Sequence, residues 1–255
     1  MMTGFHHMFK YLFLFLFLYP GFVQALTAQD VLSKQHEVNK GFRDETSIVN
    51  LILINQRGNL IKRQVLIKRL EATDQHPSKA LIRFIMPAEL MGTTLISHQN
   101  PGKSDSQWLY LAGSGKLKRI AGSSSQKSFM GTEFSFEDLL PFDAQKYSLN
   151  LLKDDLPGFH SINAIPLQNS PYAKLKILID KETYQTKKIL FYNKKETLLK
   201  TATFKDHQKV KGLYFRAQEI VMENHQNKRK TKLILQSIKV DTGLKDYEFD
   251  PHRLK

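Results

Sequence analysis

The segment Lys174-Leu-Lys-Ile-Leu-Ile-Asp180 points to the fold class because its polarity alternates residue by residue. In an extended chain, the apolar residues at 175, 177 and 179 share one face, and the charged residues at 174, 176 and 180 share the other. A period of two is typical of a strand with one buried and one solvated face. The sequence therefore predicts β structure at this position.

The same character extends outward along most of the chain. Segments rich in β-branched and aromatic residues, separated by turn residues, predict strands at 46–54, 59–70, 79–86, 92–97, 106–111, 146–152, 173–180, 186–192, 197–206, 213–223 and 231–241. A further short strand is expected at 117–120, between turns rich in glycine and serine. Because most neighbouring segments have no helix-length pattern between them, an antiparallel meander is favoured over a βαβ fold.

One helix is predicted near the start of the chain. Thr27-Ala-Gln-Asp30 has a hydroxyl cap with a carboxylate three residues later, apolar residues follow at helical spacing, and the pattern closes near Gly41. A large sheet with one helix can hide its apolar face by curling around that helix. The predicted fold is therefore mainly β within the α+β class: a half-open antiparallel barrel wrapped around or covered by one or a few helices.

Residues 1–25 are predicted to be a signal peptide. Residues 11–19 form a nine-residue apolar run, which is short of the roughly 20 residues needed to span a bilayer. Val23-Gln-Ala25 places small residues where a signal peptidase cleaves, so we expect cleavage after Ala25 and export. The alternative is an uncleaved membrane anchor. Residues 26–255 are expected to form a single domain.

The charge balance makes the protein cationic: 38 Lys and Arg stand against 24 Asp and Glu, a net charge of +14. Short basic clusters occur at 187–188, 194–195 and 228–230. Such clusters are most often solvated surface, and the alternative is attraction to an anionic membrane surface. Nucleic acid is not an expected partner, because the chain has neither a reading helix nor a stacking aromatic platform.

The inventory of reactive residues argues against catalysis. The chain has no cysteine, which excludes disulfides, thiolate metal ligands, a thiol nucleophile and a lipid anchor on an N-terminal cysteine. The histidines lack metal-ligand spacing, and no nucleophile motif is present. We therefore expect no enzymatic activity, no cofactor and no metal.

Large apolar side chains are most concentrated in residues 81–140, which contain the only tryptophan. This block is either ordinary core or the wall of an adaptable apolar pocket, for which Phe and flexible Met are suited. The pocket interpretation places these residues at the site: Phe84, Met86, Trp108, Tyr110, Phe129, Met130, Phe134 and Phe136.

Arg83 is the charged residue inside this apolar block. An isolated buried charge is too costly, so it is either paired or solvated. One hypothesis pairs it with a carboxylate of the 133–138 tract, such as Glu133 or Asp138, to hold the cover of the cavity. The other places Arg83 on the outer face of an exposed strand.

The same segments resemble the outer-membrane lipoprotein-sorting protein family, the LolA-like group of periplasmic proteins. The resemblance covers essentially all of residues 26–255, with one departure, Ala112-Gly113, where the family has a proline. The motifs that carry it are Ile82-Arg-Phe84 with Pro87, Gly92-Thr93, Gln107-Trp-Leu-Tyr-Leu111, Lys118-Arg-Ile120, Ser128-Phe-Met-Gly-Thr-Glu-Phe-Ser-Phe-Glu-Asp-Leu139, Gly212-Leu-Tyr-Phe-Arg216, Phe249-Asp-Pro251 and Leu254.

This resemblance implies a half-open barrel whose hydrophobic cavity shields acyl chains in transit between membranes. The expected function is that of a periplasmic carrier or chaperone for lipids or lipoproteins, with an inner-membrane transporter as donor and an outer-membrane acceptor. The missing cysteine separates such a carrier from the family's membrane-tethered acceptors. The alternative is a cell-envelope sensor or protein-interaction module with the same fold. As the only tryptophan, Trp108 would then report the entry of a ligand into the cavity.

Overall fold

The computed structural model describes residues 25–73, 76–153 and 156–254. Residues 1–24 of the predicted signal peptide lie outside this part of the chain, so cleavage after Ala25 stays a prediction.

The described residues form one antiparallel sheet of thirteen strands. The strands are β1 Asp44–Ile54, β2 Leu60–Leu70, β3 Lys79–Met86, β4 Thr94–His98, β5 Ser106–Leu111, β6 Lys116–Ile120, β7 Tyr147–Leu152, β8 Phe159–Pro166, β9 Tyr172–Asp180, β10 Thr186–Asn193, β11 Leu198–Val210, β12 Tyr214–Asn224 and β13 Lys230–Val240. Short 3₁₀ helices lie at Ala112–Ser114, Gly122–Gln126, Glu137–Leu139, Ala144–Lys146, Asp246–Phe249 and Pro251–Arg253.

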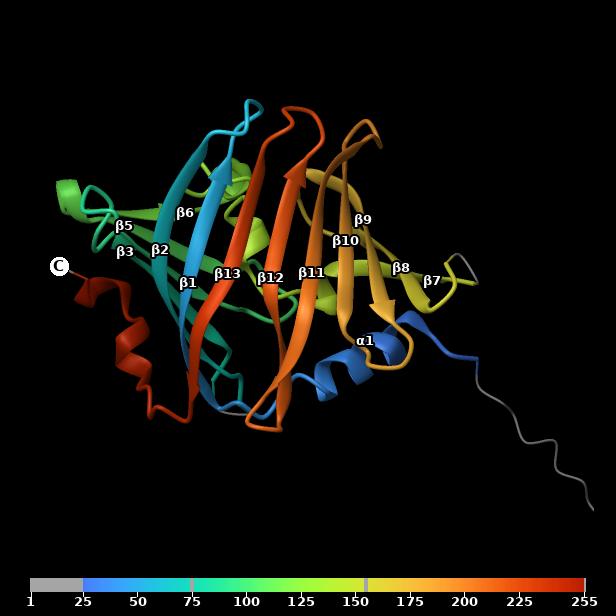
Figure 1. The fold of residues 1–255 in the computed structure, drawn as a ribbon. Helices are drawn as coiled ribbons and strands as arrows, with labels where there is room; N and C mark the ends of the chain where they lie inside the picture. The colour runs from blue at the N-terminus through green and yellow to red at the C-terminus, as the bar shows by residue number, and fades with distance from the viewer. Residues whose placement is uncertain (1–24, 74–75, 154–155, 255) are drawn as a thin grey trace, which may run out of the picture.

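The sheet consists of two meanders that meet at its centre. Strands β1 to β6 run from the centre to one edge, and β7 to β13 run from the other edge back to the centre, where β13 pairs with β1. The sheet curls so that β5 to β8 lie behind the central strands (Figure 1). Strands β6 and β7 form the two edges of the sheet and do not pair with each other, so the barrel is not closed. The predicted half-open architecture is confirmed.

The connection between the edge strands, residues 121–146, is called the crossover below. It contributes buried phenylalanines to the concave face of both meanders. Phe129 and Phe136 pack with strands β1 to β5, whereas Phe134 packs with strands β8 to β12. The crossover therefore lies inside the curled sheet and fills part of its interior.

Every predicted strand is present, and the short strand expected at 117–120 is β6. One strand was missed, β8, whose sequence Phe-His-Ser-Ile-Asn-Ala-Ile-Pro lacks a run of large apolar residues. Its buried positions include Ser161 and Ala164, and small or polar side chains give a weak strand signal.

The predicted helix is α1, Ala28–Glu37. The hydroxyl of Thr27 accepts a hydrogen bond from the Asp30 amide at 3.1 Å, and the Asp30 carboxylate accepts one from the Thr27 amide at 2.8 Å. This reciprocal cap confirms the predicted helix start. Val31 and Leu32 are buried in the same core cluster as residues of β8 and β9. Within the described residues, no helix combines the length and apolar character needed to cross a bilayer.

A smaller cluster lies on the convex face of β3 to β5. Leu81, Ile96 and Trp108 follow one another across these strands, and the fully buried Phe249 from the C-terminal segment packs on them. The C-terminal segment therefore covers the outside of the sheet, opposite the crossover.

Candidate functional site

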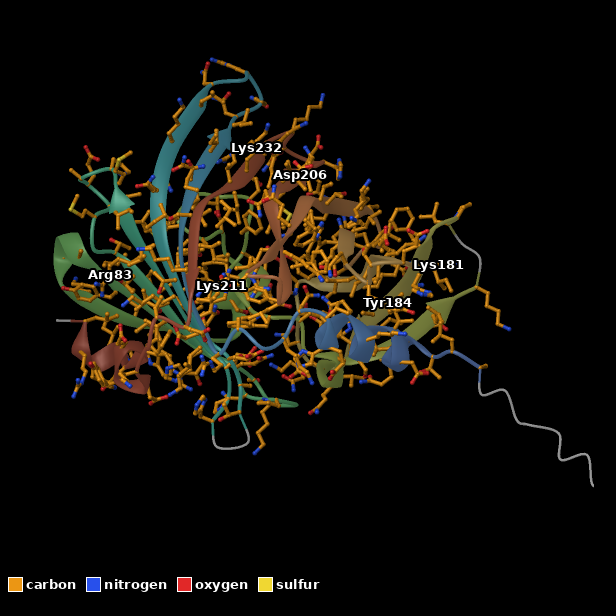
Figure 2. All side chains as sticks on the ribbon, turned by 60° about the horizontal axis from the view of Figure 1, so that its bottom comes forward. Arg83, Lys181, Tyr184, Asp206, Lys211 and Lys232 are labelled. Carbon is orange, nitrogen blue, oxygen red and sulfur yellow. The ribbon has the colours of Figure 1, made fainter. Side chains whose placement is uncertain are left out.

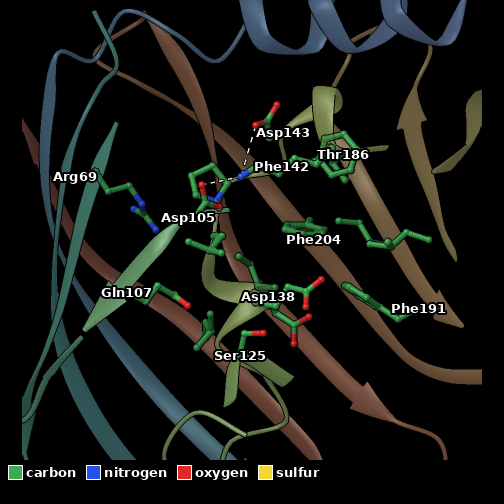
Figure 3. Close-up of a pocket in the computed structure, with 18 of the residues that line it drawn as sticks. Arg69, Asp105, Gln107, Ser125, Asp138, Phe142, Asp143, Thr186, Phe191 and Phe204 are labelled. Atoms are coloured by element: carbon green, nitrogen blue, oxygen red, sulfur yellow. Dashed lines mark hydrogen bonds and ion pairs between the residues drawn. The ribbon is translucent and has the colours of Figure 1, made fainter. Parts of the chain in front are cut away.

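A cavity of about 790 Å³ lies on the concave face, between the two meanders and beside the crossover (Figure 3). Its floor consists of apolar side chains from the central strands and from the second meander, where strand alternation points them inward. The apolar lining includes Val49, Ile67, Tyr172, Leu175, Ile189, Phe191, Phe204, Phe215, Ile220, Leu233, Leu235 and Ile238, together with Leu140, Pro141, Phe142 and Tyr147. A volume of this size is within the range of small-molecule sites.

Glu45 is a buried charged group in the cavity wall, with only 1% of its surface exposed. Its carboxylate accepts hydrogen bonds from Arg69 at 2.5 Å, Arg216 at 2.8 Å and the Tyr214 hydroxyl at 3.1 Å. Burial by itself would raise the pKa of Glu45, but the two guanidinium groups and the hydroxyl outweigh it, so the pKa is lowered. Glu45 is therefore an ionised and fully partnered carboxylate.

Asp138 ties the crossover to the opposite wall of the cavity. Its carboxylate forms an ion pair with Lys200 of β11, accepts a hydrogen bond from the Tyr172 hydroxyl at 2.7 Å, and accepts another from the Ser135 amide at 2.6 Å. Lys200 is only 4% exposed, and its ammonium group lies 5.2 Å from the ring centroid of Phe191. Asp138 therefore has several partners that satisfy its charge.

The neighbouring Glu137 is in a different electrostatic environment. Its carboxylate accepts a hydrogen bond from the Ser170 hydroxyl at 2.6 Å. Burial, reinforced by the charge of Asp138, raises the pKa of Glu137. Burial and the same carboxylates also raise the pKa of Tyr147 above its ordinary value. The phenol therefore stays neutral, and this side of the cavity offers hydrogen-bonding groups beside an apolar floor.

A second ion pair holds the far end of the crossover. Lys146 lies 2.6 Å from Asp105 and 3.6 Å from Asp143, and the Gly102 amide donates to Asp143 at 3.0 Å. These contacts join the crossover to the β4–β5 loop at the rim of the cavity, where Figure 3 shows Asp105 and Asp143. The charges at the rim are thus paired with one another, and the floor remains apolar.

The structure brings together part of the predicted site, next to this cavity. The ring of Phe129 stacks on Phe84 with centroids 5.7 Å apart and meets Phe136 edge-on at 5.6 Å. Met130 packs against the same cluster, whereas Phe134 belongs to the cluster of the second meander. These phenylalanines are at most 6% exposed, so they form packed core, and of the predicted site residues only Asp138 lines the cavity.

Trp108 and Tyr110 share a face, as predicted, but it is the convex face. Trp108 pairs with Ile96 and lies edge-on to His98, with centroids 5.0 Å apart. Leu109, which lies between Trp108 and Tyr110 in the sequence, points to the concave face and packs in the cluster with Phe84. The predicted common wall of Phe84 and Trp108 is therefore wrong, because alternation alone does not say which face of a strand is concave.

Met86 also lies away from the predicted wall. It pairs with Gln64, while Phe84 pairs with the adjacent Val65, so the register shifts between them. A bulge of this kind moves the following side chain to the other face of the sheet. Met86 is consequently 51% exposed while Phe84 is completely buried.

The predicted ion pair of Arg83 with the 133–138 tract is wrong. Arg83 lies on the convex face, where its Nε donates to the Thr94 hydroxyl at 3.1 Å. Glu133 instead pairs with Arg229 at 3.0 Å, and Asp138 pairs with Lys200. The alternative interpretation of an outward-facing arginine is the one that the contacts support.

The sequence did not identify most of the cavity lining, although the alternating pattern of β9 and β13 was visible. Those patterns indicate which side chains share a face, but they do not show that the two meanders leave space between them. Among the described residues, no group of three His, Cys, Asp or Glu side chains is placed to hold a metal ion.

Comparisons with known proteins agree with this architecture. A family described as "uncharacterized protein" matches residues 76–255, and no curated protein matches the chain. A structure described as an outer-membrane lipoprotein-sorting protein domain from Vibrio parahaemolyticus is 31% identical, with a TM-score of 0.83 over 88% of this chain and 97% of that one.

Two more distant structures share the fold. A DUF1329 family protein from Desulfovibrio piger is 22% identical, with a TM-score of 0.82 over 89% of this chain and 97% of its own. A LolA superfamily protein from Nitrosomonas europaea is 17% identical, with a TM-score of 0.69 over 89% and 98%. The two distant structures show a shared LolA-like fold, and the Vibrio match, at 31% identity over most of both chains, shows that the chain belongs to the outer-membrane lipoprotein-sorting protein family.

Proposed function

We propose that the protein is a periplasmic carrier or chaperone for lipoproteins or other lipids, which holds acyl chains in the concave cavity during transfer toward the outer membrane. The observation that carries this proposal is the apolar floor of a cavity of about 790 Å³. Several charges of its lining are held in ion pairs, Lys146 with Asp105 and Arg216 with Glu45. An acyl chain on this floor would be removed from water by apolar side chains, without breaking these ion pairs.

The energetics of such a site suit a reversible carrier. Each buried methylene contributes about 0.8 kcal/mol, so a long chain gains on the order of 10 kcal/mol before the costs of ordering and desolvation. In this proposal Ile189, Phe204 and Leu235 contact the chain. The packed cluster of Phe84, Phe129 and Phe136 lies next to the site as core and does not line it. No bond is made or broken, so a nucleophile is not required.

Export to the periplasm and exchange with membrane partners are parts of the same proposal. The membership in the lipoprotein-sorting family and the predicted signal peptide support a periplasmic location. An inner-membrane transporter would supply the cargo, and an outer-membrane acceptor would receive it.

The test compares two substitutions at adjacent residues of β13. Leu235 lines the cavity, whereas Ile234 pairs with Asn50 on the convex face, and both are half-buried. Leu235→Trp should fill the cavity, and Ile234→Trp should add the same bulk outside it. We expect native mass spectrometry of the protein purified from its own periplasm to show retained lipid in the wild type and in Ile234→Trp, and a loss of lipid in Leu235→Trp.

Two other results would count against the carrier. Equal lipid retention by both variants would place the lipid outside the cavity. Absence of lipid from the wild type, together with capture of a protein partner, would favour a cell-envelope sensor or interaction module with the same fold.

A further inference from the structure

Three hairpin turns lie side by side at one end of the curled sheet (Figure 1). They are the β1–β2 turn at 55–59, the β10–β11 turn at 194–197 and the β12–β13 turn at 225–229. The register fixes this arrangement, because Ile54 pairs with both Leu60 and Lys230, and Lys200 pairs with Asn224. We call this end of the molecule the hairpin end.

The hairpin end exposes large apolar side chains. Leu60 and Ile61, directly after the first turn, are each 55% exposed. Met86, the last residue of β3, is 51% exposed and pairs with Gln64, four residues along β2 from Leu60. Exposed side chains of this size, close together at the ends of strands, leave apolar surface in water, which is typical of an interaction surface.

Cations without an ion pair surround these apolar residues. Within the described residues, Arg57, Lys62, Lys195, Lys228 and Lys232 lie on or next to the three turns and form no salt bridge. The nearby carboxylates are already neutralised: Glu196 pairs with Lys174, and Glu223 with Lys230. The hairpin end therefore has an excess of free positive charge.

The other end of the central strands is also cationic. Lys211 and the exposed Leu213 lie in the β11–β12 turn, and Asp241, which follows β13, is paired with Arg43. Figure 2 shows Lys232 toward the tip of the β1–β2 hairpin and Lys211 away from it. The hairpin end differs in its two adjacent exposed apolar residues, Leu60 and Ile61, which lie next to several unpaired cations.

We propose that the hairpin end docks on the surface of an anionic lipid bilayer. Leu60 and Ile61 enter the boundary between head groups and acyl chains, while Lys228, Lys232 and Arg57 lie against lipid phosphates. An exposed apolar strand end next to cations on the adjacent turns complements a fluid anionic surface, whereas a protein partner would need a matching hollow. This inference deepens the proposed carrier function, because it names the surface through which the carrier meets a membrane.

The test measures sedimentation of the purified protein with vesicles of phosphatidylethanolamine and phosphatidylglycerol, and with vesicles of phosphatidylcholine alone. We expect binding to the anionic vesicles that weakens with added salt, and little binding to phosphatidylcholine. Leu60→Ser with Ile61→Ser, and separately Lys228→Glu with Lys232→Glu, should each weaken binding by about tenfold or more.

The matched control is Leu213→Ser with Lys211→Glu, which changes the same residue types at the other end and should leave vesicle binding unchanged. Circular dichroism checks that each variant is folded. Equal binding to both kinds of vesicle, or an equal loss in the control variant, would overturn the proposal, as would the absence of vesicle binding. Retained lipid in native mass spectrometry is a separate readout, so docking and cargo binding can fail independently.

Discussion

The ring of Phe129, in the crossover, stacks on the ring of Phe84, in β3, with centroids 5.7 Å apart. Both side chains are buried to 2% exposure or less. This contact joins the crossover to the sheet, so the cavity beside it depends on core packing between segments 45 residues apart by their residue numbers.

Truncating Phe129 should therefore have the effect of a core substitution. We expect Phe129→Ala to lower the free energy of unfolding by about 3 to 5 kcal/mol, because the ring leaves a void between Phe84 and Phe136. Urea unfolding measures this loss. Phe142→Ala, at a ring that is 36% exposed in the cavity lining, is the control and should cost less. Similar losses in the two variants would contradict the packing argument.

Replacing only one partner of the Lys200–Asp138 ion pair should lower the free energy of unfolding. Lys200→Met leaves a carboxylate that is only 2% exposed without its cation, and we expect a loss of about 3 to 5 kcal/mol. The double variant Lys200→Met with Asp138→Asn should recover part of that loss, since no unpaired charge remains.

The matched control lies on the same strand. Lys205 pairs with Glu219 at 3.0 Å but is 48% exposed, so Lys205→Met should cost less than about 1 kcal/mol. Chemical denaturation of all three variants checks both statements. A double variant as unstable as Lys200→Met alone would show that charge pairing is not the source of the effect.

The ionised Glu45 carboxylate should raise the free energy of unfolding, and this contribution should be lost in acid. Its folded-state pKa is lowered from the ordinary value of 4.5, so its contribution is complete above pH 4.5 and is lost as the pH falls through the folded-state pKa. Glu45→Gln should cost about 3 kcal/mol near neutral pH, because Arg69 and Arg216 lose their counter-charge. The difference from the wild type should shrink below pH 4.5 in urea titrations. A difference that is constant with pH would contradict this assignment.

Trp108 should not report the occupancy of the cavity, contrary to the expectation from the sequence. It lies beside His98 on the convex face, in the cluster with Phe249. We expect its emission to stay constant when a fatty acid binds, and to shift in Phe249→Ala, which uncovers the indole. An emission change on ligand addition, with none in Phe249→Ala, would place the ligand on the convex face.

The sequence by itself determined the helix, most of the strands and the antiparallel character of the sheet, because these depend on local patterns. It did not determine the strand order, since β13 pairs with β1 across distant segments of the chain. The alternation of Lys174 to Asp180 fixed a strand with one buried face, and the Thr27–Asp30 cap fixed the start of α1. Local signals failed at β8, where Ser161 and Ala164 occupy buried positions. They also failed at Met86, because a bulge places its side chain on the opposite face of the sheet from Phe84.

Only the tertiary structure decided which face is concave and which charges meet. Arg83 and Asp138 are both charged residues of the same apolar block, but the curl of the sheet places Arg83 outside and sets Asp138 against Lys200 from another meander. The cavity likewise arises where β9 to β13 face β1 and β2 across the crossover. A strand pattern of period two carries no information on curvature or on contacts between distant strands, so these features depend on how the whole sheet folds.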